Sequence, residues 1–418
     1  MSGATSRTLT ARYIIPVEGP PIPQGRITIE GSRITAIGTN VGRAADIDLG
    51  NVAILPGFVN AHTHLELSAI EPPTSWPEPE IAWLKRVIGQ RRDGTRADLL
   101  NNVRQNLAAS LKAGTTLIAD TTTAGLSWPA IADAPIRGVV FAEILGLSRM
   151  RGIQTDAEAQ DWLSSVTQVD MIRANSRPGL SPHAPYSTAG WLYRKAAKSK
   201  LPLSTHLAEM PEERELLEHG TGELRRFLEE LGAWDPGFEP IGPSPVDYVL
   251  KGELRDADWL IAHGTYLEPS EFRQLRSETV PGSRRVAVAY CPRTHARFGH
   301  AKHPYQAMHA QGVVVCLGTD SLASSPTLGI LDEARFLARR DEGVSPHLLL
   351  SMATLFGAWA LRAECDTGSL VVGKSADLAI VALPDREDEP GQLVLQSDLS
   401  VVATMFKGRF VHGLHVDL

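Results

Sequence analysis

The chain has few of the features that mark membrane proteins and disulfide-rich secreted proteins. Its 418 residues include only three cysteines, Cys291, Cys316 and Cys365, and no two of them form a Cys-x-x-Cys pair. This spacing excludes a disulfide framework and a zinc site built from thiolates. The sequence also lacks an apolar run long enough to cross a membrane, and its first residues lack the apolar core of a secretory signal. We therefore expect a cytoplasmic protein that does not act at a membrane.

The chain also lacks an excess of positive charge and several catalytic motifs. The formal net charge is −7, which argues against a surface that binds nucleic acid. There is no GxxxxGK[ST] loop for nucleoside triphosphates and no GxSxG turn that would present a nucleophilic serine. The composition is otherwise that of an ordinary globular protein, with 43% hydrophobic and 21% charged residues. These absences leave chemistry on a small-molecule substrate as the open possibility.

The two ends of the chain have a different pattern from the middle. Residues 8–55 and the last fifty residues alternate apolar and polar positions between turn residues, which predicts short strands. We predict that 1–54 and 366–418 form one small composite β-sandwich around an inserted domain at 55–365. That domain alternates helical patterns with eight apolar runs, which predicts a (β/α)8 TIM-like barrel. The runs are 53–64, 115–120, 136–145, 177–185, 201–209, 258–264, 284–292 and 312–320.

Polar residues that can bind a metal or move a proton recur where these runs end. His62 and His64 end the first run, and His183 ends the fourth. His206 lies in the fifth run, His263 in the sixth, and Asp320 ends the eighth. Active sites of such barrels lie at the carboxyl ends of the strands. The recurrence therefore predicts one site that is shared by several strands.

Four of these residues could bind a divalent metal. The period of two places His62 and His64 on one face of a strand, and neutral imidazoles suit zinc, iron or copper. An isolated His-x-His is more often simply two polar residues at a strand end. His206 would add a third imidazole and Asp320 a carboxylate, although GTDS is also a good turn or helix-capping sequence. These ligand types accept both zinc and iron. We expect one divalent metal, zinc before iron.

A second metal is not favoured. No lysine lies between Lys112 and Lys195, so the fourth strand cannot offer a modified lysine that bridges two metals. The spacing of His295, His300 and His303 is compatible with a second metal site. A loop at the mouth of the barrel, with one substrate contact, is the interpretation that we favour for them.

Three further residues have both a catalytic and a structural interpretation. Glu209, three residues after His206, is either a general acid and base or an acid that favours the start of the next helix. His263 either orients a water molecule by hydrogen bonding or is a satisfied histidine at a strand end. His183 either contacts the substrate or stabilises a turn between prolines.

At these residues the chain resembles the amidohydrolase superfamily, in the branch of chlorohydrolases and nucleoside or nucleobase deaminases. The resemblance spans nearly the whole chain through GFVNAHTHLELS, SPHAPYST, STHLAE, AHGTYL, YCPRTH and LGTDSLASSPTLGILDEAR. It implies a barrel with a β-sandwich and metal ligands at His62, His64, His206 and Asp320. It also implies that Glu209, His263 and Asp320 are catalytic and that His183 contacts the substrate.

Within this branch, NAHTHLELS and WLKRVIGQRRD are most similar to deaminases of 6-aminodeoxyfutalosine, with S-adenosylhomocysteine and methylthioadenosine deaminases as near neighbours. In these enzymes a tryptophan is followed nine residues later by a glutamate that binds the ribose hydroxyls. Here Trp83 is followed at that distance by Arg92, and Asp93 comes next. Either Asp93 serves after a shift of one residue, or the contact is absent.

The resemblance implies a hydrolytic deaminase of an aminated N-heterocycle, most simply an adenosine-type nucleoside such as 6-aminodeoxyfutalosine. One alternative is the hydrolysis of another C–N or C–halide bond on a related ring. Another is a relative without catalysis, which is disfavoured because every expected ligand is present. The resemblance also makes a homodimer possible, whereas no nucleic acid or membrane partner is expected.

Overall fold

The structure is a computed structural model that describes residues 6–39, 44–67, 77–242, 244–277 and 282–414. Its central element is a barrel of eight parallel strands, in which each strand pairs with the next along the chain. A parallel bridge between Thr63 and Asp320 joins the last strand to the first. The strands are β6 (Phe58–Thr63), β7 (Thr115–Thr123), β8 (Arg137–Ile144), β9 (Ser176–Pro182), β10 (Leu203–Leu207), β11 (Trp259–His263), β12 (Val286–Tyr290) and β13 (Val314–Leu317).

The barrel confirms the fold predicted from the eight apolar runs, because each run overlaps one of these strands. The strands are short and buried along most of their length, as in VAVAY of β12. Strands that are covered on both faces read as continuous apolar runs rather than as alternating ones. The interior is filled by small and branched side chains from six strands, namely Val59, Ala61, Leu117, Ala119, Val139, Phe141, Leu260, Ala287, Ala289 and Cys316.

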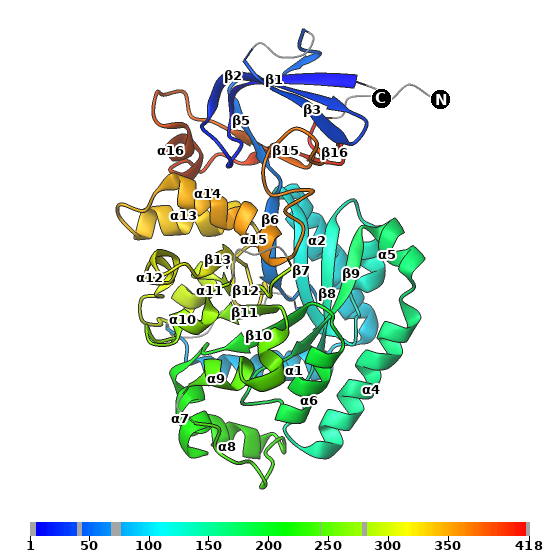
Figure 1. The fold of residues 1–418 in the computed structure, drawn as a ribbon, viewed down its shortest axis with the longest axis vertical. Coiled ribbons are helices and arrows are strands. Elements are labelled where there is room, and N and C mark those ends of the chain that lie inside the picture. Colours follow the sequence, from blue (N-terminus) through cyan, green and yellow to red (C-terminus); the bar gives the residue numbers. More distant parts are fainter. Residues whose placement is uncertain (1–5, 40–43, 68–76, 243, 278–281, 415–418) are drawn as a thin grey trace.

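Helices surround the barrel and fill the connections between its strands (Figure 1). The larger ones before β10 are α1 (Glu80–Asp93), α2 (Arg96–Lys112), α4 (Arg149–Ser165) and α6 (Gly190–Lys198). Those after it are α7 (Pro211–His219), α8 (Glu223–Glu230), α13 (Ile330–Arg340) and α14 (Pro346–Ala353). The shorter ones are α3 (Trp128–Asp133), α5 (Gln168–Ala174), α9 (Pro245–Val249), α10 (Phe272–Leu275), α11 (Pro292–Arg297), α12 (Tyr305–Ala310), α15 (Leu355–Ala360) and α16 (Pro390–Leu395), with a 3-10 turn at Gly252–Asp256.

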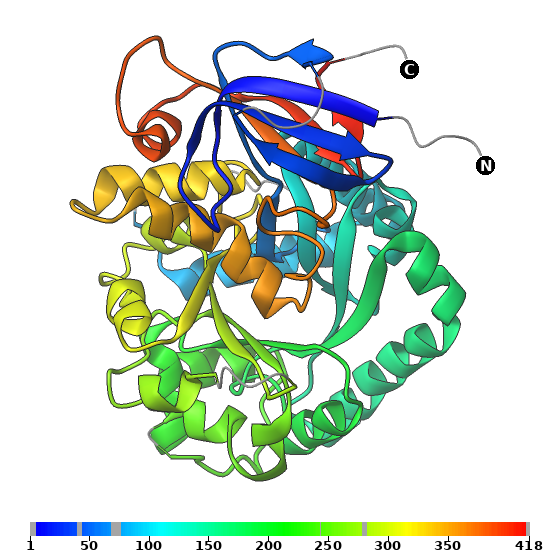
Figure 2. The ribbon, with the colours of Figure 1, turned by 45° about the horizontal axis from the view of Figure 1, so that its top comes forward.

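The two chain ends meet in a second sheet, which lies above the barrel in Figure 1. Its strands are β1 (Ser6–Ile14), β2 (Ile22–Glu30), β3 (Arg33–Gly38), β4 (Ile47–Asp48), β5 (Val52–Pro56), β14 (Leu378–Ala382), β15 (Val401–Phe406) and β16 (Arg409–His412). The order is β16-β15-β14-β5-β1-β2-β3, with β4 beside β1, so β5 and β14 join the two ends of the chain. Figure 2 shows both ends of the ribbon reaching this sheet. The predicted β unit from both termini is confirmed, and its boundaries at 54 and 366 remain predictions.

A single glycine connects the terminal sheet to the barrel. β5 ends at Pro56 and β6 begins at Phe58, and the N–H of Gly57 donates to the carbonyl of Asp377 at 2.8 Å. A Cβ at Gly57 would lie 2.0 Å from Oγ1 of Thr116. This close approach fixes how β6 enters the barrel. It thereby helps to position the two histidines that follow.

Candidate metal and catalytic centre

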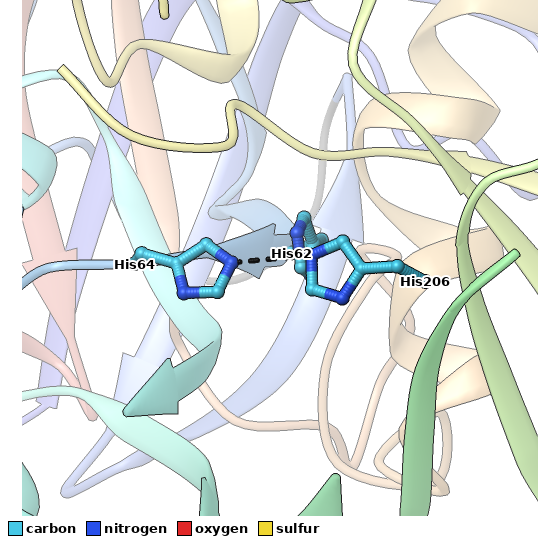
Figure 3. A group of neighbouring side chains, drawn as sticks. All are labelled: His62, His64 and His206. Atoms are coloured by element: carbon cyan, nitrogen blue, oxygen red, sulfur yellow. Dashed lines mark hydrogen bonds between the residues drawn. The ribbon is translucent and has the colours of Figure 1, made fainter. Parts of the chain in front are cut away.

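Three histidines from two opposite parts of the barrel come together at its carboxyl end. His62 lies on β6, His64 follows that strand, and His206 lies on β10. One nitrogen from each ring lies within 4.8 Å of the others, and Nε2 of His64 is 3.3 Å from Nε2 of His206 (Figure 3). Residues 62 and 206 are far apart in the sequence. The barrel brings them together, as the strand-end pattern predicts, because it aligns the ends of its strands.

The three rings offer what a metal ion requires. Nε2 of His62 is buried and has no hydrogen-bond partner among the described residues. Burial, together with the neighbouring imidazoles, holds the pKa of His62 and of His206 well below the ordinary value, so both rings are neutral. Nδ1 of His206 lies 3.2 Å from the carbonyl oxygen of His183, which leaves Nε2 facing the cluster. Neutral imidazoles held in this way by a neighbouring group are typical metal ligands.

Asp320 lies beside this cluster. Its Oδ1 is 3.9 Å from Nε2 of His64, and its Oδ2 accepts a hydrogen bond from Ser324. Burial raises the pKa of Asp320, and the neighbouring His64 opposes that rise. The residue has a φ of 54°, in the left-handed region that non-glycine residues adopt uncommonly and aspartate more often than most. The donor set of three imidazoles and a carboxylate therefore fits a divalent metal such as zinc or iron.

Glu209 and His263 form a pair next to the cluster. Oε1 of Glu209 lies 3.1 Å from Nε2 of His263, and both side chains are buried. Burial is the main cause that raises the pKa of Glu209 well above its ordinary value, and the nearby Glu80 and Asp320 act in the same direction. A carboxyl group with a raised pKa can donate a proton near neutral pH. The pair has the geometry and the environment of a proton-transferring group.

His183 presents one ring nitrogen to the same space. Its Nδ1 lies 2.6 Å from Oγ of Ser187, and its ring centroid is 4.8 Å from that of His206. Because Nδ1 is engaged, Nε2 is the atom available to a substrate. The structure thus brings together seven residues that the strand-end pattern predicted, namely His62, His64, His183, His206, Glu209, His263 and Asp320.

The family spacing singled out Trp83, Arg92 and Asp93 as candidates for substrate binding. All three lie on α1, but they differ in position. Trp83 is buried, packs on the ring of Phe298 and donates from Nε1 to the carbonyl of Ala323 at 2.9 Å. Arg92 and Asp93 are exposed at the last turn of α1, away from the buried cluster. Successive residues of a helix point about 100° apart. The structure therefore does not bring Arg92 and Asp93 to the site.

The neighbouring Arg91 is the residue of this turn that reaches buried carboxylates. It lies 2.6 Å from Glu66 and 3.6 Å from Glu143, the penultimate residue of the third barrel strand, β8. Sequence reasoning missed both contacts. Glu143 could have been found by the rule that found His183 and His206, because it also lies at the carboxyl end of a strand. Arg91 could not, because its partners are distant in sequence.

A further acid was also missed. Glu80, at the start of α1, is buried, and its Oε2 lies 3.2 Å from Nε2 of His300. Glu80 contributes to the raised pKa of Glu209, which places it beside that residue. No motif marks Glu80, since it is one of several acidic residues in the stretch WPEPEIAW.

Two of the three histidines that follow β12 line a pocket, and the three do not form a second metal site within the described residues. His295, Phe298 and His300 line a pocket together with Glu209 and His263. His303 lies just behind this pocket, and its Nε2 is 2.8 Å from the carbonyl oxygen of His263. Within the part of the chain that the structure describes, the one group arranged for a metal is that of His62, His64 and His206.

Comparison with known proteins agrees with this geometry. The profile of the amidohydrolase family matches residues 53–411, which is most of the chain. The chain belongs to the amidohydrolase family. It is 30% identical over 400 residues to a 5-methylthioadenosine/S-adenosylhomocysteine deaminase of Moorella thermoacetica, covering 88% of this chain and 83% of that protein.

Solved amidohydrolase structures share the fold over almost the full length. Helicobacter pylori aminofutalosine deaminase, solved in complex with methylthio-coformycin, matches with a TM-score of 0.80 and 21% identity, over 97% of this chain and 100% of that chain. Atrazine chlorohydrolase from Arthrobacter aurescens, complexed with zinc, matches with a TM-score of 0.76 and 21% identity, over 97% and 95%. At this identity the likeness shows the fold alone, since one fold hosts many activities.

Proposed function

We propose that this amidohydrolase is a metal-dependent deaminase that hydrolyses the exocyclic amine of an adenosine-type nucleoside. The observation that carries the proposal is the contact between Glu209 and His263, 3.1 Å apart, next to the cluster of His62, His64 and His206. Relatives named for deamination of methylthioadenosine, S-adenosylhomocysteine and aminodeoxyfutalosine support the substrate class. Aminodeoxyfutalosine is the member of this class that we favour.

The metal that we propose is a single divalent ion, zinc before iron. His62, His64, His206 and Asp320 would hold it. A metal bound there would lower the pKa of a coordinated water molecule and would stabilise negative charge on oxygen. A bound zinc in the related chlorohydrolase supports this choice of metal.

Residues of the chain itself transfer the proton, stabilise the added oxygen and bind the heterocycle. Glu209 accepts a proton from the attacking water and donates it to the ring nitrogen next to the carbon that carries the amine. His263, fixed by its contact with Glu209, hydrogen-bonds the oxygen as it adds to that carbon. Nε2 of His183 binds the heterocycle. The amine leaves as ammonia after it receives the proton of the added hydroxyl group, and the carbonyl product remains.

The partner that this site takes is a small molecule. None of the described helices is long and apolar enough to cross a membrane. Assembly as a homodimer and location in the cytoplasm remain predictions from the sequence.

The experiment that tests the function is a substrate panel with ammonia release as the readout. The metal-loaded protein is assayed with 6-aminodeoxyfutalosine, S-adenosylhomocysteine, methylthioadenosine, adenosine, guanine and a chlorinated triazine. The control for the site is Glu209→Gln, and the matched control is Glu218→Gln, an exposed glutamate on α7. Turnover of an adenosine-type nucleoside that only Glu209→Gln abolishes supports the proposal. Release of chloride from the triazine, without ammonia from any nucleoside, contradicts it.

A further inference from the structure

A group of charged side chains, two buried carboxylates and a half-buried guanidinium, lies next to the metal and proton-transfer residues without belonging to them. It consists of Glu66, Arg91 and Glu143, which come from the segment after β6, from α1 and from the end of β8. We propose that Glu143, held in place by Arg91, binds the ribose hydroxyls of the nucleoside substrate. This inference rests on the proposed function and names the part of the substrate that the site recognises.

Glu66 fixes the position of Arg91. Oε2 of Glu66 accepts hydrogen bonds from Oγ1 of Thr122 at 2.7 Å and from the backbone N–H of Thr123 at 3.1 Å. Its Oε1 accepts from Oγ1 of Thr123 at 2.8 Å and lies 2.6 Å from Nη2 of Arg91. A carboxylate with this many donors is fully occupied and has no capacity left for a substrate. Its role is to anchor the guanidinium.

Glu143 is different, because it retains capacity to accept hydrogen bonds. Within the described residues its ion-pair partner is Arg91, whose Nη1 lies 3.6 Å away. An ionised carboxylate accepts about four hydrogen bonds. Burial opposes its ionisation, but the neighbouring His183 and Arg91 outweigh burial and hold the pKa of Glu143 below its ordinary value. Glu143 is therefore a charged acceptor that is only partly satisfied by the protein.

The strand places this acceptor inside the barrel. Glu143 lies on the same face of β8 as Val139 and Phe141, which belong to the side chains that fill the barrel. It pairs with Ser181 of β9, two residues before His183. Because β8, β9 and β10 are consecutive, Glu143 is about 10 Å across the sheet from His206. His183, which binds the heterocycle in the proposed function, follows β9, the strand beside β8, and the charge of Glu143 acts on it. The proposal therefore places the sugar attached to that heterocycle beside Glu143.

The charge of the group selects the kind of substrate atom. Two carboxylates and one guanidinium leave one negative charge, so a phosphate or carboxylate is repelled there. A neutral group with two adjacent hydrogen-bond donors fits, and the 2′ and 3′ hydroxyls of ribose are such a group. This contact takes the place of the glutamate that was expected nine residues after Trp83, since Arg92 and Asp93 are exposed.

The test removes the ribose hydroxyls from the substrate and the carboxylate of Glu143 from the protein, first separately and then together. kcat/KM is measured for the best nucleoside of the panel and for its 2′,3′-dideoxy analogue, with wild-type protein, Glu143→Gln and Glu30→Gln. Glu30 is an exposed glutamate at the end of β2 and serves as the matched control. We expect either single change to lower kcat/KM by about 10- to 100-fold, as for the loss of hydrogen bonds to a charged group. We expect Glu143→Gln to change the rate with the dideoxy analogue less than threefold.

Two outcomes overturn the inference while the deaminase proposal stands. One is a wild-type enzyme that does not distinguish the two nucleosides. The other is a Glu143→Gln variant that loses the same factor with both. If Glu143→Gln does not fold, Arg91→Lys replaces it, and a rise in KM with unchanged kcat for the hydroxylated nucleoside alone is expected. Absence of ammonia from every nucleoside, with metal bound, is the separate result that removes the proposed function itself.

Discussion

Two groups of buried polar side chains lie at the same end of the barrel, and they are satisfied in opposite ways. In the first, three imidazoles converge beside the carboxylate of Asp320, and Nε2 of His62 has no hydrogen-bond partner in the described part of the chain. In the second, Glu66, Arg91 and Glu143 neutralise one another in part. An unsatisfied buried polar atom costs about 1–3 kcal/mol. The first group therefore offers the donors that a metal ion needs, whereas the second fixes a charge in advance.

The largest effect is expected when an imidazole is removed from the first group. We expect His62→Ala to lose the metal and, with it, essentially all deaminase activity, because the remaining donors no longer enclose the ion. Metal analysis of the purified protein checks this, with the exposed His219→Ala as control. Asp320→Ala is expected to weaken metal binding as well. Stoichiometric metal and full activity in either site variant would show that the residue is not an essential ligand.

Glu209→Gln separates proton transfer from metal binding. The amide cannot exchange the proton, so we expect kcat to fall by about 10²–10⁴-fold. Metal content should be unchanged, because Glu209 is not in the group of converging ring nitrogens. Ammonia release gives kcat and metal analysis gives the metal content, both measured on one preparation of the variant. Near-normal turnover would exclude the proposed role.

The charged group is expected to respond in stability rather than in metal content. Arg91→Met leaves Glu66 buried without its cation, and we expect a loss of about 1–3 kcal/mol, discounted because Arg91 is partly exposed. Denaturant unfolding measures it. The double variant Arg91→Met, Glu66→Gln should recover part of the loss. An unchanged midpoint for Arg91→Met would show that the pair does not hold Glu66.

The smallest effect is expected at the end of α1. Arg92→Ala and Asp93→Ala change exposed side chains, so kcat/KM should change less than twofold and stability by no more than about 0.5 kcal/mol. Steady-state kinetics with the best nucleoside is the check. A tenfold rise in KM for either variant would restore the role that the family resemblance suggested for this turn.

Much of the centre could be predicted because its residues obey a local rule. Buried parallel strands are apolar runs, and the residue at the end of each run faces the active site, so His183, His206 and His263 could be placed without coordinates. The same rule covers Glu143, which lies near the end of the third run. Trp83 and Arg92 show where an inferred spacing fails, because a shift of one residue on a helix changes the side that a residue faces.

Periodicity and side-chain chemistry, which are properties of short segments, are enough to predict the barrel, the terminal sheet from both chain ends and the set of residues able to bind a metal. Three features depend instead on how α1 and the strand ends pack against remote segments. Arg91 rather than Arg92 reaches the site, Glu80 lies beside Glu209, and Nε2 of His62 has no partner among the described residues. No short segment of the sequence specifies these contacts, because each joins residues that are far apart in the chain.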